Sequence, residues 1–258
     1  MKRLYENYLI GYVLGIVFFF GVWELASWAV STFAAKPSLQ GAVPPPLRAI
    51  SILVSEWRDL AQHFFASGYR VLSGLLLSIV IATPLGLVIG HERVLDRLLS
   101  PSIYLTYPIP KVVFLPLLFV FLGLYDAPKI GLITLVLVFQ LLLSTRDAAK
   151  SVAKSHILSV VSAGASKWHV YKHVVLPASL PALLSALRVS VGTAIMALAL
   201  TEAFASRYGL WRYIYDQWSR YGNYEHMFAG ILAMGLLGLA FYIIIDLIER
   251  WVCRWQYV

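Results

Sequence analysis

The sequence has 258 residues, of which 60% are hydrophobic and only 13% are charged. Soluble domains carry about 25% charged residues, so this composition excludes an ordinary soluble protein and favours a membrane protein. The formal net charge of +8 comes from Lys and Arg in short segments between apolar blocks, whereas nucleic acid binding needs basic residues clustered on one face, so we expect no nucleic acid partner.

Six apolar blocks follow one another along the chain, and a helix needs roughly 20 such residues to cross a bilayer. The first block, Leu9–Phe33, is longer than the apolar core of a signal peptide. We therefore interpret it as a retained span, with cleavage near Ala34-Ala35 as the alternative. The other blocks cover about residues 64–90, 103–122, 129–143, 180–204 and 227–248.

The segment between the first two blocks contains three consecutive prolines, 44–46, which cannot continue a helix because proline lacks the amide N–H. The stretch Leu47–Leu60 then repeats apolar residues at helical spacing, with a polar face opposite. This pattern predicts one amphipathic helix at the membrane interface. We expect residues 1–62 to form the first span and this helix, and residues 63–258 to form a core of five further spans.

The third block is interrupted by Pro108, Pro110 and Pro116, which predict a kinked or broken span. Irregular backbone at membrane depth is tolerated where it is buried in protein or lines a cavity. The prolines therefore suggest a place on a translocation pathway.

Ionisable residues inside the spans are the other candidates for a pathway, because a charge at membrane depth is costly and normally faces the interior of the bundle. Lys111 and Arg188 would favour anions there. In the alternative interpretation Arg188 extends to the membrane surface and Glu202 anchors the outer end of its span. The candidate pathway residues are Pro108, Pro110, Lys111, Arg188 and Glu202.

The stretch Leu158–Pro177, between the fourth and fifth blocks, is rich in small residues. Gly164 permits a sharp turn, and we expect Pro177 and Pro181 to break the helix before the next span. The pattern predicts one or two short helices on the membrane surface, which are either a plug for a groove on a partner or an ordinary interfacial loop. An apolar stripe is formed by Val170, Val174 and Val175.

The spacing from Gly164 to Leu176-Pro177 resembles the EAA loop of permease subunits of binding-protein-dependent ABC importers. The front of the loop departs from that pattern, since Leu158-Ser159-Val160 stands where the family has an acidic residue and two small ones. Further stretches are similar to the nitrate, sulfonate, taurine and bicarbonate branch, namely residues 44–46, 67–72, 108–111, 209–214 and 228–232.

The resemblance implies an all-α, six-span type I permease whose core is residues 63–258. It implies a homodimer, two ABC ATPase subunits on the cytoplasmic loops and an external substrate-binding protein. The substrate would be a small anion such as a sulfonate, taurine, nitrate or bicarbonate. The residues that would couple to the ATPase are Leu158, Ser159, Ser162, Ala163, Gly164, Ala165, Ser166, Trp168, Leu176 and Pro177.

The sequence contains no Gly-Lys pair and hence no P-loop, so ATP and Mg would be bound by the partner ATPase subunits. With one cysteine and scattered histidines, we expect no metal, no cofactor and no catalytic site in this chain. One alternative is the same machinery importing a vitamin or pyrimidine precursor. Another is an ATP-independent secondary transporter, which would need deep paired ionisable groups or inverted repeats, and we expect neither.

The distribution of Lys and Arg between the spans decides the expected orientation. More of them fall in the segments that a cytoplasmic N-terminus would place inside the cell. With six spans, both termini would then be cytoplasmic. We expect a multi-pass protein of the bacterial inner membrane, in contact with lipid.

Overall fold

The computed structural model describes residues 2–36 and 39–256, which form helices and connecting turns without any strand. Five helices are long and apolar enough to cross a membrane, and the bent pair of residues 93–106 and 111–122 raises the number to six when it is counted as one span, which is the predicted count. The elements are α1 (Lys2–Phe33), α2 (Pro46–Ser55), α3 (Trp57–His91), α4 (Arg93–Thr106), η2 (Lys111–Phe114), α5 (Leu115–Leu122), α6 (Asp126–Ser151), α7 (Lys154–Ser162), α8 (Lys167–Val170), η3 (Tyr171–Val175), α9 (Leu176–Glu202), α10 (Leu210–Asp216), η4 (Gln217–Tyr221), α11 (Tyr224–Val252) and η5 (Arg254–Gln256).

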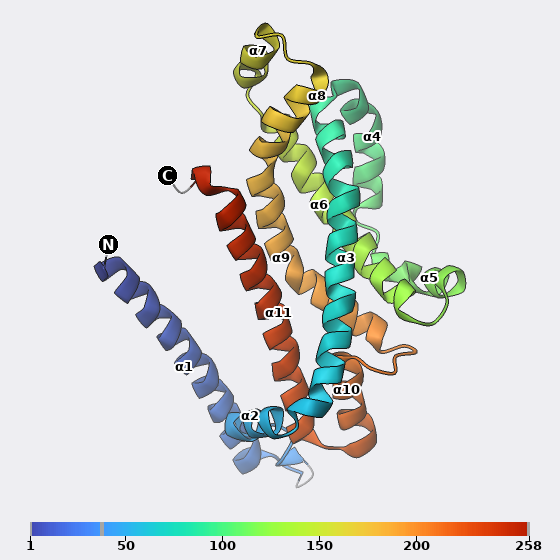
Figure 1. Cartoon of the computed structure of the whole chain (residues 1–258). Helices are drawn as coiled ribbons and strands as arrows, with labels where there is room; N and C mark the ends of the chain where they lie inside the picture. The colour runs from blue at the N-terminus through green and yellow to red at the C-terminus, as the bar shows by residue number, and fades with distance from the viewer. Residues whose placement is uncertain (1, 37–38, 257–258) are drawn as a thin grey trace.

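The centre of the molecule is the bundle of α3, α6 and α9 (Figure 1). Helices α3 and α6 approach closely because Gly74 and Gly90 on α3 face Ile133 and the backbone of Arg146 on α6, and a Cβ at either glycine would overlap those atoms. The apolar core between the three helices includes Val71, Leu75, Ile133, Leu137, Leu141, Leu187, Ala194 and Leu198.

Helix α1 leans away from the bundle and approaches it at one end, beside α2 (Figure 1). Two hydrogen bonds attach it there, from Trp23 Nε1 to the carbonyl of Pro44 (2.9 Å) and from Ser27 Oγ to the carbonyl of Val43 (2.8 Å). Most of its described side chains are exposed. The first span is therefore held at its α2 end, and its described side chains beyond that end present an apolar surface.

The amphipathic helix predicted over Leu47–Leu60 is divided, because α2 ends at Ser55 and Trp57 already begins α3. Only part of the predicted apolar stripe faces the protein: Leu47 and Val54 are exposed, whereas Leu53 is half-buried and packs against the core. An exposed stripe is stable in contact with lipid, so hydrophobicity alone does not mark the packed face. The expected boundary between residues 62 and 63 falls within α3.

The prediction that Pro177 and Pro181 break the helix before the fifth span is wrong, because the chain is one continuous helix from Lys167 to Glu202. The short π segment η3 precedes α9, and the amide of Leu176 donates to the carbonyl of Tyr171, five residues back. Pro177 follows shortly after this π segment, and such a local π adjustment accommodates a proline inside a helix.

Candidate functional site

The residues predicted to form an EAA-like loop lie together at one end of the molecule, where α7 and α8 project beyond the spans (Figure 1). We call residues 154–177 the surface segment. Gly164 adopts a positive φ of 86° and ends α7. Its amide donates to the carbonyl of Val161 (2.9 Å), and that of Ala165 donates to the carbonyl of Val160 (3.1 Å). This pair is a Schellman motif, so the predicted tight turn is confirmed and has a physical cause.

The inner side of the surface segment is apolar. Val170 and Val175 are buried in one cluster with Leu87 at the end of α3 and Ala149 at the end of α6. Val170 and Val175 of the predicted stripe therefore hold the segment against the bundle, whereas Val174 is half-buried and is not part of this cluster, and Lys172 is exposed. Half-buried residues complete the cluster: Ile157, Val160, Ala165, Tyr171 and Leu176.

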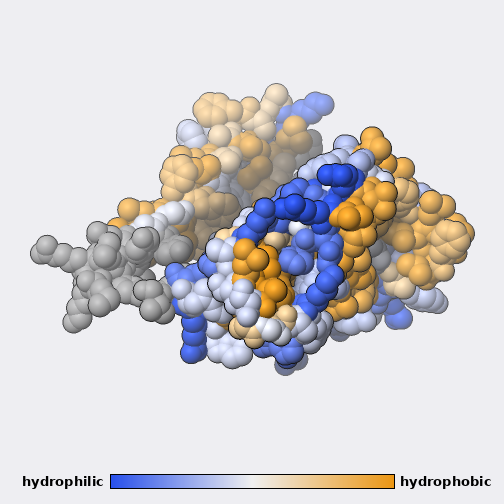
Figure 2. Space-filling view, turned by 90° about the horizontal axis from the view of Figure 1, so that it is seen from above, coloured by the Kyte–Doolittle hydropathy of each residue, from blue (hydrophilic) through white to orange (hydrophobic). Residues whose placement is uncertain are grey.

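The outer side of the surface segment exposes apolar and small residues. Leu158 is 62% exposed and Trp168 is 71% exposed. Figure 2, which looks onto this end, shows hydrophilic residues in an arc around a hydrophobic patch. Most of the surface of both side chains is uncovered within the described chain, and a contiguous exposed apolar patch is typical of a surface that binds another protein. A hollow of about 520 Å³ in the segment is lined by Ser159, Val160, Ala163, Gly164, Ala165, Ser166, His169 and His173.

The third span is broken at its prolines. The bent pair of α4 with η2 and α5 turns by 84° across residues 107–110, which include Pro108 and Pro110. The Lys111 ammonium lies under this bend and donates to the carbonyls of Thr106 (2.6 Å), Tyr107 (3.0 Å) and Ile109 (2.8 Å). All three of its N–H groups thus have partners. This geometry favours a structural role for Lys111 over attraction of an anion.

Arg146 connects α4 to α6. Its guanidinium is 4% exposed and donates to Asp96 (2.6 Å), Ser100 (2.7 Å) and the hydroxyl of Tyr104 (2.9 Å), all on α4. Lys150 binds the other carboxylate oxygen of Asp96 (2.6 Å). These contacts lie in the part of α6 that extends to Ser151, eight residues beyond the end predicted from hydropathy.

Arg188 pairs across two spans. Its Nη1 lies 2.5 Å from Asp246 and 3.4 Å from Glu249, both on α11. The ring of Tyr242 lies 5.7 Å from the guanidinium. Arg188 is therefore neutralised within the described chain, and it ties α9 to α11. The expectation that the spans contain no paired ionisable groups is wrong.

A second buried ion pair joins α3 to α9 at the end of the molecule that carries α10. Glu202 is fully buried and accepts hydrogen bonds from Arg70 (2.6 Å) and Ser67 (2.7 Å). Arg70, itself 5% exposed, also lies 2.7 Å from Asp126 at the start of α6. Charges removed from water in this way are stable only with such partners. Glu202 thus ties this end of α9 to α3.

The backbone between α9 and α10 closes over this ion pair. The amide of Trp211 donates to Glu202 (3.0 Å), and Arg70 donates to the carbonyl of Tyr208 (2.8 Å). Gly209 passes so close that a Cβ would overlap the Glu202 carboxylate. Lys129, 1% exposed, donates to the carbonyls of Tyr125 (2.9 Å) and Ala205 (3.2 Å). We call residues 67, 70, 126, 129 and 202 with this turn the buried charge network.

The candidate pathway residues are not brought into one cluster. Lys111, Arg188 and Glu202 each have their own partners, on different elements. Sequence reasoning missed Arg70 and Arg146 as organising residues. The available signal was an arginine near a span end together with a carboxylate near the end of another span, but the sequence does not say which span ends are neighbours.

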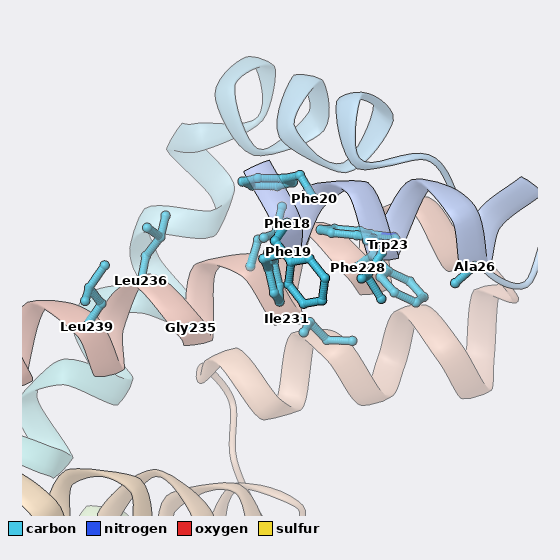
Figure 3. Close-up of a pocket in the computed structure, with 12 residues that line it drawn as sticks. Phe18, Phe19, Phe20, Trp23, Ala26, Phe228, Ile231, Gly235, Leu236 and Leu239 are labelled. Atoms are coloured by element: carbon cyan, nitrogen blue, oxygen red, sulfur yellow. The ribbon is translucent and has the colours of Figure 1, made fainter. Parts of the chain in front are cut away.

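Two apolar grooves run beside α11. One lies between α1 and α11 and has a volume of about 690 Å³. Figure 3 shows Phe19 and Trp23 of α1 turned toward Phe228 and Ile231 of α11 there. The other, of about 750 Å³, lies between α9 and α11, with Arg188 and Trp211 among its lining residues. Their linings are almost entirely apolar.

Comparison with known proteins gives a family match and several relatives. Residues 74–254 match the family model described as binding-protein-dependent transport system inner membrane component. A probable ABC transporter permease protein of Brucella abortus (strain 2308) is 29% identical over 90% of this chain and 92% of its own length. The taurine transport system permease protein TauC of Escherichia coli K12 is 27% identical over 89% of this chain and 85% of its own.

A third relative and a solved structure extend the comparison. The formylaminopyrimidine transport permease protein ThiX of Halalkalibacterium halodurans is 23% identical over 99% of both chains. A chain in an inward-facing structure of the MetNI methionine ABC transporter superposes with a TM-score of 0.66 at 19% identity, over 75% of this chain and 95% of that chain. At this identity the structural likeness concerns the fold.

Proposed function

Because the chain belongs to the family of binding-protein-dependent transport system inner membrane components and is an ABC importer permease subunit, we propose that two copies of it enclose the substrate pathway. Its fold is that of a type I ABC importer permease. Residues 158–177 then dock onto two separate ABC ATPase subunits. The ATPase subunits bind ATP and Mg, and an external binding protein delivers the substrate.

One observation carries the docking proposal: the surface segment exposes Leu158 and Trp168 around a hollow of small residues, at the end of the bundle. A partner surface that covers these side chains gains the free energy of removing apolar area from water. The segment begins with Leu158-Ser159-Val160 and lacks an acidic residue there. The contact therefore depends on shape and apolar fit.

The orientation follows from the same proposal. The end with α7 and α8 faces the cytoplasm, and the end with α10 faces the binding protein outside. The excess of Lys and Arg expected on the inner side supports this orientation. Both termini are then cytoplasmic, and the protein lies in the bacterial inner membrane.

The substrate we propose is a small anion such as a sulfonate or taurine, with nitrate and bicarbonate in the same class. The similarity to the taurine permease supports it. The alternative is a vitamin or pyrimidine precursor, which the similarity to the formylaminopyrimidine permease favours. The binding protein sets most of the selectivity, so its ligand decides between these substrates.

The test of docking is whether an ATPase subunit co-purifies with the chain. We expect Gly164→Glu and Ala163→Trp to abolish co-purification, because each places a large side chain on the small-residue surface. Ala35→Trp, the same change at the opposite end of the molecule, is the matched control and keeps the ATPase bound. Retention of the ATPase by both surface-segment variants would disprove the assignment, and uptake without any ATPase would favour a secondary transporter.

A further inference from the structure

The joint between α3 and α4 is a single residue. Helix α3 ends at His91, α4 begins at Arg93, and Glu92 between them is extended, with φ −90° and ψ 105°. The Glu92 side chain makes no capping hydrogen bond to α4, although an acidic residue at a helix N-terminus often does. Its carboxylate is therefore available to another element.

That other element is the surface segment. The hydroxyl of Tyr171 donates to Glu92 Oε1 at 3.3 Å, and the ring of Tyr171 stands edge-on to the ring of His91, with centroids 4.9 Å apart. Lys167, on α8, places its ammonium 3.9 Å from the same carboxylate oxygen. Two residues of the segment thus meet the α3–α4 joint, and Tyr171 is the half-buried one.

The packing of the surface segment on the bundle fixes the position of Tyr171. It begins the π segment η3, in which hydrogen bonds reach five residues back. This winding brings Val170 and Val175 to the same buried cluster, together with Leu87 at the end of α3. Single π turns of this kind are frequent at functional sites. Tyr171 is consequently packed against the buried floor of the surface segment and not on its exposed outer side.

Helix α4 is held at two places. Near its start, Glu92 is bound to the surface segment through Tyr171. Further along, Asp96, Ser100 and Tyr104 are bound to Arg146 on α6. A displacement of Tyr171 therefore pulls one end of α4 while the Arg146 contacts hold the next turns. Beyond these contacts lies the 84° bend of the third span.

We propose that Tyr171 is a positioning residue that transmits movement of the surface segment to the α3–α4 joint, and so to the broken third span. This inference rests on the proposed function, because the movement comes from ATPase subunits docked on the segment. The chain connects the segment to α6 and α9 covalently. The bond between Tyr171 and Glu92 adds a lateral connection to the span that contains the bend.

The experiment measures substrate molecules transported per ATP hydrolysed, in the complete complex reconstituted with its binding protein. The variants are Tyr171→Phe, Glu92→Ala and the double variant, with Tyr69→Phe, an exposed tyrosine on α3, as the matched control. Loss of one hydrogen bond predicts a fall in this ratio of about threefold in each single variant. The double variant falls no further, because both changes remove the same contact.

The ratio distinguishes transmission from mere stability, since a smaller amount of folded complex lowers transport and hydrolysis together. Ratios equal to the wild type in both single variants, or effects that multiply in the double variant, would overturn the inference. A different result would contradict the proposed function itself: the wild-type chain would purify without any ATPase. A complex that retains its ATPase but shows unchanged ratios in the variants contradicts only the role of Tyr171.

Discussion

Both ends of the bundle contain a buried arginine paired with a carboxylate, Arg70 with Glu202 and Arg146 with Asp96, but they differ in how α3, α6 and α9 meet the segment that covers them. At the α10 end, α3, α6 and α9 are joined by the buried charge network, in which Arg70 and Glu202 lie 2.6 Å apart. At the α7–α8 end, the same three helices meet the surface segment through an apolar cluster around Leu87 and Val175. The first contact depends on direction and distance, whereas the second depends on buried area.

This difference indicates which end of the bundle is able to move. Each charge of a buried ion pair is stabilised only while the opposite charge stays close to it. The α10 end is therefore held in one arrangement. An apolar contact tolerates small displacements, because the hydrophobic effect is non-directional. The surface segment therefore suits a part that is pushed by a partner, and the hydrogen bond of Tyr171 to Glu92 gives its movement a direction.

The largest expected effect is the loss of the buried charge network. Arg70→Met leaves Glu202 as an unpaired buried charge, and we expect a cost of about 3–5 kcal/mol in stability. The measurement is the thermal unfolding midpoint of the purified protein in detergent. Adding Glu202→Gln to Arg70→Met recovers part of the loss. Arg220→Met, which removes an exposed pair with Asp216, costs less than about 1 kcal/mol and is the control.

A smaller loss at the same end is expected for Gly209→Ala. The new Cβ would overlap the Glu202 carboxylate, so the network must shift at a cost of about 1–3 kcal/mol. Gly222→Ala is the comparison, because Gly222 also has a positive φ, of 61°, but open space around it. Equal unfolding midpoints for the two variants would show that the close approach of Gly209 to Glu202 does not affect the stability of the protein.

Lys111→Met tests a residue near neither end, at the bend of the third span. Three carbonyls lose their donor, and we expect a destabilisation of about 1–3 kcal/mol. The KM for substrate uptake by the reconstituted complex stays unchanged, because the ammonium is already occupied. A raised KM together with an unchanged unfolding midpoint would instead place Lys111 on the pathway of an anion.

The smallest effect on stability belongs to the exposed face of the surface segment. Trp168→Ala changes the free energy of unfolding by less than about 0.5 kcal/mol, because the ring is 71% exposed. The same variant weakens ATPase binding about tenfold or more, as removal of an aromatic anchor does. Trp218→Ala, a similarly exposed tryptophan at the α10 end, leaves ATPase binding unchanged. Comparable ATPase binding by both variants would contradict the docking assignment.

The local features of the surface segment were predictable because they arise from neighbouring residues. Gly164 was expected to form a sharp turn, and it closes a Schellman motif whose partners, Val160 and Val161, are four and three residues before it. The break at Pro108 and Pro110 was expected for the same reason, since proline acts on its own backbone. The interruption predicted at Pro177 failed, because the π segment before it changed the hydrogen bonding.

The sequence by itself determined the number of spans, the membrane class and the place of the turn at Gly164, because these follow from hydropathy and local backbone chemistry. Only the tertiary structure decided that Arg70 meets Glu202, that Arg188 meets Asp246 and that Tyr171 reaches Glu92. Each of these pairs is separated by more than fifty residues in the chain. Packing decides which spans lie side by side, as at Gly74 against Ile133. Such packing involves residues of two distant segments, so neither segment predicts it alone.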